Sequence, residues 1–549
     1  MNFNDYMDWK AMSVLGLLPA ENPEFKEKEL LVNDIENVHH QRMVEYVTWY
    51  AGGSDAIYNL YNVNSMVEYP TEPFYWKNRR SYYWCKSATD DEIKRTHCGF
   101  VRDMIDTTVL VCGDASYSVG DAQNRQFIAG MDAETVLDKV LEANSFQSLC
   151  RRRQMPMTLV EGWGAFKITW NVELYGDDPV IHYYRAENVR VYRRAGRLLG
   201  MTFLDWYNGG LGKKYLVAET RLRKNGRCSV TTECFRVDGD NLAFVDAEEA
   251  KGIIGSGSNW SDMPCLFAEP CSFYDDPLHN YEGRSVLEGK LDLLDDLDQA
   301  FSQASNTVRR SGPIETLDIE YCERDPKTHE PKLPKTFERK YVVIQGQRNS
   351  LGESEGGKPI DVTQPQLNTQ MYDDHILTLE RTVINGHLSP STMGLDIDRK
   401  DHSKDDTVRD ISVTLFTRNH INKEEGRILT SLARQVLVAK EYLATGVVTK
   451  MPEDWMVKVT FDEFSDKSYE AKVESLSAVL VNDGISPEMY VDKVYGKTIA
   501  GDARQREIQW ITENHKNPVQ DAGMMGGAMD VDGMSDVAQQ DDAAVLGGA

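Results

Sequence analysis

The 549-residue sequence predicts an α+β protein, and three observations support this fold class. Helical hydrophobic periodicity dominates the N-terminal third and the C-terminal half, whereas residues 165–245 form short β-rich runs separated by turn residues. These runs follow one another without intervening helices, which favours antiparallel pairing over βαβ units. At about 150 residues per domain, the length corresponds to roughly three or four domains.

Two helices are expected in the N-terminal third. The first covers residues 29–49 and ends against Gly52 and Gly53, a glycine stop. The second covers residues 133–150, with Asp132 as its N-cap and the basic cluster 151–153 behind it, which suits a helix C-terminus.

An aromatic-rich segment, residues 73–84, lies between these two helices. It places six aromatic side chains around three basic ones, namely Phe74, Tyr75, Trp76, Tyr82, Tyr83 and Trp84 around Lys77, Arg79 and Arg80. Such a mixture could stack on single-stranded bases. Core or subunit-interface anchors are the commoner use of these residues, and we favour that interpretation.

The central region predicts a mostly meandering antiparallel sheet. Its expected strands are 166–174, 180–184, 189–192, 199–204, 214–221, 229–235 and 242–245. Turn sequences such as 176–179 and 238–239 separate them.

The clearest helical pattern follows at residues 285–310. Ser285 and Glu288 form a capping box, and the helix is expected to end at residues 311–313. Its apolar positions, at steps of three and four, are Leu287, Leu291, Leu294, Leu297, Phe301, Ala304 and Val308. The other face holds an acidic stripe formed by Glu288, Asp292, Asp295, Asp296 and Asp298.

A small module is expected after this helix. Strands at 314–321 and 340–345 flank a Pro- and Lys-containing excursion with Lys327, Lys332 and Lys335. After a glycine-rich turn, a second helix runs from about residue 367 to 385. Helix, β-excursion and helix is the order expected when a module is carried on a two-helix stalk.

The C-terminal half is predicted to be largely helical. A polar loop at 387–404 contains Arg399, Lys400 and Lys404, and a long helix with a kink at 419–426 covers residues 406–445. A strand at 455–461 precedes helices at 469–481, 487–494 and 502–512. Residues 517–549 hold six Asp and no Lys, Arg or Glu, which predicts a disordered acidic tail.

Charge and missing motifs exclude several function classes. The net charge of −26 argues against a general nucleic-acid-binding surface, because such binding depends on Lys and Arg at the phosphates. Gly212-Lys213-Lys214 lacks the other positions of a phosphate-binding loop, and the acidic loop at 396–401 lacks the glycine of a calcium loop. Without GxSxG or HExxH, the sequence points away from an enzyme and implies no cofactor or metal.

The cysteines and the apolar pattern bear on compartment. Nine cysteines are scattered without a CxxC motif, which favours reduced thiols in a cytoplasmic protein over disulfides or zinc ligands. No apolar run approaches the ~18 residues that cross a bilayer, and the N-terminal residues do not follow the pattern of a signal peptide.

The order of these elements resembles the portal proteins of tailed double-stranded DNA bacteriophages. The resemblance rests on Tyr281-Glu282-Gly283-Arg284-Ser285 before the acidic helix, the excursion and returning helix, Ser389-Pro390, Met393-Gly394-Leu395-Asp396 and Ser403-Lys404-Asp405-Asp406. Upstream, Asn144, Phe146, Gly162, Gly164 and Trp170 are similar to the entry of the portal wing domain. The resemblance covers residues 26–515.

The resemblance to portal proteins implies a ring, usually of twelve subunits, at one capsid vertex, with a portal fold in each subunit. The implied parts are a wing at 1–280, stem helices at 281–310 and 367–386, a clip at 311–366, a tunnel loop at 387–405, a long kinked helix at 406–445, a wing return strand at 446–466 and a helical crown at 467–516. The acidic tail at 517–549 is not covered.

The resemblance also implies partners and residue roles. Double-stranded DNA would be packaged through the channel by the terminase, and tail adaptors would attach later to the same ring; scaffold and major capsid proteins would surround it. The acidic stripe from Glu288 to Asp298 would line the channel, and Lys327, Lys332 and Lys335 would face the motor and adaptors.

Alternatives remain at the level of sequence. Arg399, Lys400 and Lys404 could touch DNA from the tunnel loop, or be solvated charges balanced by Asp398 and Asp401. The chain could instead be another virion structural protein, such as a tail or baseplate component, or a cytoplasmic enzyme with an unrecognised site.

Overall fold

The computed structural model has mixed helix and strand, in agreement with the α+β class. It describes residues 42–62, 82–85, 94–120, 127, 130–170, 178–194, 196–208, 213–224, 226–238, 241–245, 247–254, 260–277, 282–311, 314–318, 324, 326, 340–344, 360–363, 369–395, 411–462, 476–477, 480, 485–495 and 502–515. The chain divides into two units, residues 1–462 and 463–549.

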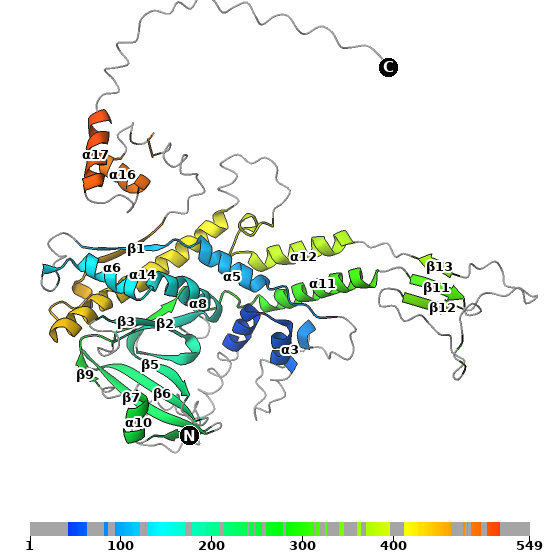
Figure 1. The fold of residues 1–549 in the computed structure, drawn as a ribbon, viewed down its shortest axis with the longest axis horizontal. Coiled ribbons are helices and arrows are strands. Elements are labelled where there is room, and N and C mark those ends of the chain that lie inside the picture. Colours follow the sequence, from blue (N-terminus) through cyan, green and yellow to red (C-terminus); the bar gives the residue numbers. More distant parts are fainter. Residues whose placement is uncertain are drawn as a thin grey trace, which may run out of the picture. The chain divides into compact units, whose positions relative to one another are not determined.

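A six-stranded antiparallel sheet confirms the meander expected in the central region. Its strands are β4 (Val189–Arg194), β5 (Arg197–Asn208), β6 (Lys214–Lys224), β7 (Arg227–Asp238), β8 (Asn241–Phe244) and β9 (Trp260–Met263). The first five pair in chain order, and β9 joins β7 (Figure 1). Gly196 and Gly226 have φ values of 76° and 79° at the tight turns after β4 and β6, which glycine adopts without strain. The short helix α10 (Ala247–Ile254) follows β8.

The first two strands of the expected meander belong to a separate sheet. β2 (Trp163–Thr169) lies between β3 (Val180–Arg185) and β10 (Ala268–Ser272), with antiparallel pairing to both. Six of the seven residues of β2 are buried, because the strand runs through the centre of the larger core cluster. A strand buried on both faces does not alternate in sequence, so its sheet membership was not evident from the pattern.

Residues 133–161 form a broken helix rather than the continuous one expected to end at 150. The pieces are α6 (Ala133–Ala143), α7 (Phe146–Leu149), a π-helical turn (Cys150–Gln154) and α8 (Met155–Glu161). Asp132 caps α6 as predicted, accepting from Thr135 N at 3.1 Å. The break occurs because the Asn144 side chain bonds to Pro179 O and Ile181 N across the core. The basic cluster therefore lies inside the helical run, where Arg151 contacts Asp114.

Helix α14 (Ser412–Thr445) is the longest helix of the described chain, and it packs against the three-stranded sheet of β10, β2 and β3 and against a two-stranded sheet. One of these sheets pairs β14 (Val457–Phe461) with β1 (Ala115–Val119) in antiparallel register, so the chain returns to its N-terminal region as expected. The helix is continuous through 419–426, where we expected a kink. The hydrophobic pattern fades there because Arg418, Asn422 and Glu425 are buried polar residues.

Glu425 is one of these buried polar residues. Its carboxyl accepts from Gln154 Nε2 at 3.0 Å, while Glu425 Oε1 and Gln154 Oε1 have no hydrogen-bond partner. Burial raises its pKa to about 7. Because the folded pKa exceeds the unfolded one, the unfolding free energy falls as pH rises between about 4.5 and 7.

Replacing Glu425 by Gln should therefore stabilise the protein at pH 8, by roughly 1–3 kcal/mol, since the amide removes the cost of a buried charge. The gain should shrink towards pH 5, as measured by urea unfolding at both pH values. The matched control is Glu424→Gln, at a partly exposed residue paired with Arg427, which should change stability by less than about 0.5 kcal/mol at either pH. An equal effect of Glu425→Gln at both pH values would show that titration is not its cause.

A second core cluster joins the N-terminal helices to the start of helix α11 (Leu291–Arg310). It contains residues from the helix at 42–51, from α3 (Ser54–Asn62), from the short 3₁₀ turn Tyr83–Cys85 and from α5 (Phe100–Val111). The helix at 42–51 is followed by Gly52 and Gly53, both with positive φ, which confirms the predicted glycine stop. Tyr82, Tyr83 and Trp84 are buried here, in line with the core interpretation of the aromatic segment; residues 63–81 lie outside the described residues.

Two helices and a small sheet follow. Helix α11 (Leu291–Arg310) leads to β11 (Ile314–Asp318), β12 (Lys340–Ile344) and β13 (Ile360–Thr363), and α12 (Thr369–Ile384) returns to the core. β11 pairs with β12 in parallel and with β13 antiparallel. Figure 1 shows this sheet beyond the far ends of α11 and α12. The two predicted strands are confirmed, and β13 is an addition to the prediction.

Gly162 and Gly283 form a tight backbone contact next to α11. A Cβ atom on Gly283 would lie 2.3 Å from Gly162 O, and Gly162 itself has a φ of 93°. Any larger side chain at 283 would therefore force the end of α8 away from the segment that leads into α11.

Gly283→Ala should consequently cost about 1–3 kcal/mol of unfolding free energy, a typical overpacking penalty. Gly252→Ala in α10 is the matched control, because a Cβ there meets nothing within 4 Å. This control should be neutral or stabilising by up to about 1 kcal/mol. Equal urea midpoints for the two variants would contradict the close contact.

The second unit has a small apolar cluster of its own, formed by Leu480, Val491 and Ile511. Two of its helices are described over their full length, α16 (Pro487–Tyr495) and α17 (Asp502–His515), close to the expected bounds, whereas most of the helix expected at 469–481 lies outside the described residues. Ser486 Oγ accepts from Met489 N at 3.2 Å, so the predicted N-cap is confirmed. The acidic tail lies outside the described residues.

Candidate functional site: the anchored two-helix projection

Helices α11 and α12 pack side by side in antiparallel orientation (Figure 1). Near the core, Lys290 Nζ donates to Val383 O at 2.6 Å, and towards the far end Thr307 Oγ1 donates to Tyr372 OH at 3.3 Å. The first contact joins the start of α11 to the end of α12, and the second joins the end of α11 to the start of α12. We call α11, α12 and the sheet β11–β13 the projection.

The projection is fixed to the rest of the unit by polar side chains on one face of α11. Asp298 is fully buried and accepts from Trp84 Nε1 at 3.0 Å and from Cys98 N at 3.0 Å. His97 Nδ1 lies 2.8 Å from the same carboxylate. One turn further along, Ser302 Oγ accepts from Thr96 N at 2.9 Å.

Asp295 continues this row of anchors towards the start of the helix. Its carboxylate accepts from Tyr83 N at 2.6 Å and from Trp84 N at 3.3 Å. Burial raises its pKa to about 6, although these backbone donors act in the opposite direction. Asp295, Asp298 and Ser302 thus hold two segments, residues 82–84 at the 3₁₀ turn and residues 96–98, against one helix face.

The acidic stripe predicted on α11 is therefore not a single solvent-facing surface. Asp295 and Asp298 have 4% and 0% exposure, and their assignment to a channel wall was wrong because they bind backbone donors inside the subunit. Asp292 and Asp296 are exposed, and Glu288 is partly exposed and pairs with Arg42 at 3.1 Å. Sequence periodicity could not separate the two sets, since the donors come from distant segments.

The start of α11 also differs from the expectation. The helix begins at Leu291, with Lys290 as its N-cap, and Gly289 in a left-handed conformation precedes it. Ser285 Oγ accepts from Leu287 N within a turn, so it does not form the predicted capping box. Leu294 and Leu297 are buried as predicted, in the core of the subunit.

Asp298→Ala should destabilise the protein by about 3 kcal/mol, because buried donors of Trp84 and Cys98 would lose their acceptor. Asp296→Ala, two residues away on the exposed side, should change the unfolding free energy by less than about 0.5 kcal/mol. Chemical unfolding monitored by tryptophan fluorescence measures both. Similar losses in the two variants would contradict the anchoring role of Asp298.

The other predicted site residues cannot be compared with the structure. Arg399, Lys400 and Lys404 of the tunnel loop lie outside the described residues. So do Lys327, Lys332 and Lys335 of the clip. Their roles stay predictions.

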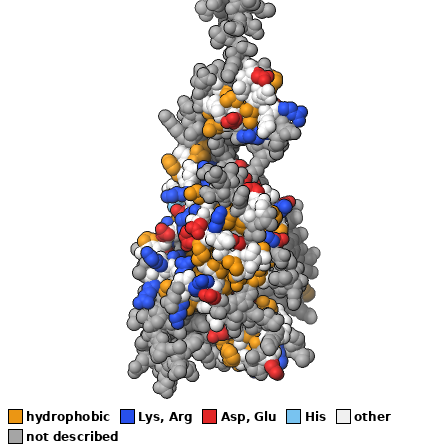
Figure 2. Space-filling model, turned by 90° about the vertical axis from the view of Figure 1, so that its left-hand side faces the viewer, with side chains coloured by type: hydrophobic (Ala, Val, Ile, Leu, Met, Phe, Trp, Pro, Cys, Tyr) orange, Lys and Arg blue, Asp and Glu red, His pale blue; other side chains and the backbone are white. Residues whose placement is uncertain are grey.

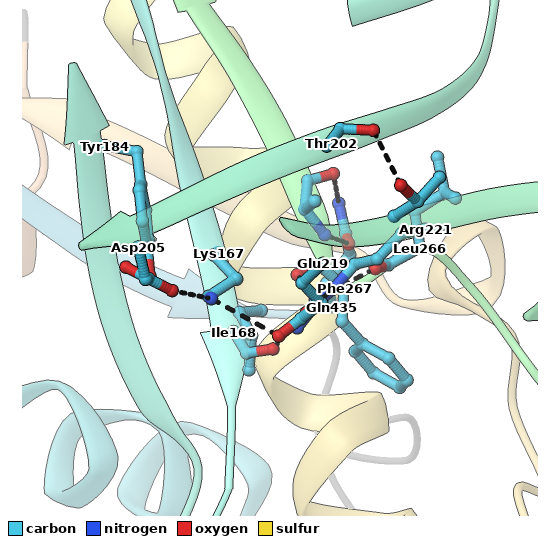
Figure 3. Close-up of polar contacts among 12 residues, drawn as sticks. Lys167, Ile168, Tyr184, Thr202, Asp205, Glu219, Arg221, Leu266, Phe267 and Gln435 are labelled. Carbon is cyan, nitrogen blue, oxygen red and sulfur yellow. Dashed lines mark hydrogen bonds and ion pairs between the residues drawn. The ribbon is translucent and has the colours of Figure 1, made fainter. Parts of the chain in front are cut away.

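A buried ionic cluster between the six-stranded sheet and the sheet of β10, β2 and β3 was not anticipated from sequence (Figure 3). Lys167 Nζ of β2 lies 3.3 Å from Asp205 and 3.4 Å from Glu219, and it sits over the Tyr184 ring. Arg221 contacts Glu219 at 2.7 Å and donates to three carbonyl oxygens, those of Ile168, Leu266 and Phe267.

This cluster is a structural clamp rather than a reactive site. Burial by itself would raise the pKa of Glu219, but the charges of Arg221 and Lys167 lower it to about 2. Tyr184 donates to Asp205 at 2.8 Å, so the charged groups of the cluster have partners. Groups that are held ionised and fully engaged are poor proton donors or nucleophiles.

The remaining chemistry of the described residues is sparse. They contain no group of three or more His, Cys, Asp or Glu side chains that could hold a metal ion. The eight described cysteines are free thiols. No helix in the described ranges has the length and apolarity to cross a membrane. In Figure 2, several Lys and Arg side chains gather on the left-hand side of the face shown.

No model of a known protein family matches this chain, and a search of curated proteins gives no match.

Proposed function

We propose that the chain is the portal protein of a tailed double-stranded DNA bacteriophage. In this role twelve copies form a ring at one capsid vertex, through which the terminase packages DNA and to which tail adaptors attach. The observation that carries the proposal is the anchored projection: two antiparallel helices, rooted in the core, that lead to a small sheet. This is the order of stem, clip and stem that the resemblance implies.

The return of the chain after the projection supports the same proposal. β14 pairs with β1, so residues after the long helix rejoin a part of the fold that precedes the projection. The resemblance implies such a return strand in the wing. The crown of the proposed portal would correspond to the second unit, residues 463–549.

Charge on the projection fits a conduit that does not bind DNA tightly. Asp292 and Asp296 are exposed on α11, and Asp373 and Asp374 are exposed on α12. Twelve copies of such carboxylates around a channel would repel phosphates and keep DNA free to slide. The buried Asp295 and Asp298 play no part in this effect.

Ring assembly needs surfaces that a single subunit leaves uncovered. Val308 on α11 and Met371 on α12 are 55% and 59% exposed in the outer half of the projection. In a closed ring, neighbouring projections would cover these apolar side chains. Leu294 and Leu297 are unsuitable for testing this, because they pack inside the subunit.

The full-length protein should therefore form particles of about 750 kDa, twelve times the 62.3 kDa chain mass. Mass photometry of the purified protein under assembly conditions measures this directly. Only monomers and dimers across a range of salt and protein concentrations would contradict the proposal.

Val308→Asp combined with Met371→Asp should reduce the ring fraction at least tenfold, since charge at a desolvated contact opposes association. The subunit should keep its unfolding midpoint, because both side chains are exposed. Val308→Ile with Met371→Leu is the conservative control and should form rings normally. Unimpaired rings in the Asp variant would remove the projection from the subunit interface.

A further inference from the structure

A groove between α14 and β14 is a surface feature that the proposed function does not use. Its volume is about 880 Å³, and we call it the α14–β14 groove. One stripe of α14, from Asn419 to Arg434, lines it together with all five residues of β14. Gly426 permits the close approach of helix and strand, since a Cβ there would lie 3.3 Å from the Phe461 ring.

Within the described part of the chain, the groove runs along the edge of β14 that has no paired strand. Side chains alternate across a strand, so a groove that touches five successive residues must follow the backbone edge. Among the described residues, β14 pairs with β1 alone. Gly120 N donates to Met456 O at 2.8 Å and Asp462 N donates to Asp114 O at 3.2 Å. The register then directs the backbone groups of residues 457, 459 and 461 away from β1.

The charge of the groove is opposite to that of the chain. Its described lining has four cationic side chains, Lys423, Arg427, Arg434 and Lys458, of which Arg427 also pairs with Glu424, and one acidic side chain, Glu269. Burial raises the pKa of Glu269 to about 7, which weakens its negative charge near neutrality. In a chain of net charge −26, this groove is a local cationic surface.

Polar groups in the groove lack partners. Asn422 is 7% exposed, and its Oδ1 atom has no hydrogen-bond partner. The Nε atom of Arg434 is buried and also without one. The two residues are twelve positions apart on α14, about 18 Å along the helix axis, so these are separate unsatisfied groups towards opposite ends of the stripe that lines the groove.

We propose that the α14–β14 groove binds an extended acidic polypeptide segment of a partner chain, which adds to the free edge of β14. Its backbone pairs with residues 457–461, and its carboxylates contact the Lys and Arg side chains of α14. Lys423 and Arg427 are one helical turn apart, about 6 Å, and alternate residues of an extended strand are about 7 Å apart. Successive carboxylates on one face of the segment can therefore reach successive cations.

A nucleic acid fits the groove less well. Phosphate oxygens are acceptors only, whereas the carbonyl groups of the β14 edge are acceptors that need a donor. The carbonyl oxygens of the β14 edge would face the phosphates without a hydrogen bond between them. The inference does not depend on ring formation, so it can fail or hold independently of the proposed portal function.

The test is fluorescence polarisation with full-length protein and a labelled heptapeptide of alternating Asp and Val. Two companion peptides are used: one with Asn in place of Asp, and one with alternate backbone amides N-methylated. We expect binding of the first peptide and at least tenfold weaker binding of both companions, since one loses the charges and the other cannot add as a strand.

Variants locate the site. Lys423→Glu with Arg427→Glu should weaken binding at least tenfold, and both residues are exposed, so the unfolding midpoint should not move. Lys213→Glu with Lys214→Glu makes the same charge change at two exposed residues on the six-stranded sheet and should alter binding less than twofold. The inference is overturned if the Asp–Val peptide does not bind, or if the groove variant or the N-methylated peptide binds normally. Tighter binding of a short DNA duplex with the same dependence on Lys423 and Arg427 would also overturn it.

Discussion

Buried carboxylates on α11 determine how the projection joins the rest of the unit. A carboxylate without partners would be expensive inside a protein, so Asp298 is tolerated only because Trp84, His97 and Cys98 surround it with polar contacts. The same requirement works in reverse, because the stretches at 82–84 and 96–98 need acceptors for their backbone N–H groups. Helix and stretches therefore fix each other's positions, and the direction of the projection follows from them.

Acidic residues serve two different purposes on this one helix. Asp295 and Asp298 organise the subunit interior, whereas Asp292 and Asp296 face outwards. In the proposed ring, only the outward set can act on DNA, which makes the predicted channel less densely charged than the sequence stripe suggested. The basic α14–β14 groove shows that the net charge of −26 is an average over surfaces of opposite character.

Sequence patterns were most informative where neighbouring residues decide the structure. The meander β4–β8 and the caps at Asp132 and Ser486 follow from turn glycines and local hydrogen bonds, and each was predicted. Sequence patterns were least informative where contacts between distant segments decide the structure. The break at Asn144 depends on residues 179–181, and the fading pattern in α14 comes from buried polar groups such as Glu425. The clamp around Lys167 joins strands β2, β5 and β6, so no local spacing of residues predicts it.

The central claim is that twelve projections surround an axial channel. Single-particle electron microscopy of the assembled full-length protein tests it most directly, because it gives both the symmetry and the position of α11. The account predicts closed rings with α11 and α12 beside the axis and Asp296 towards the channel. A particle without a central channel, or a ring whose projections point away from the axis, would contradict it.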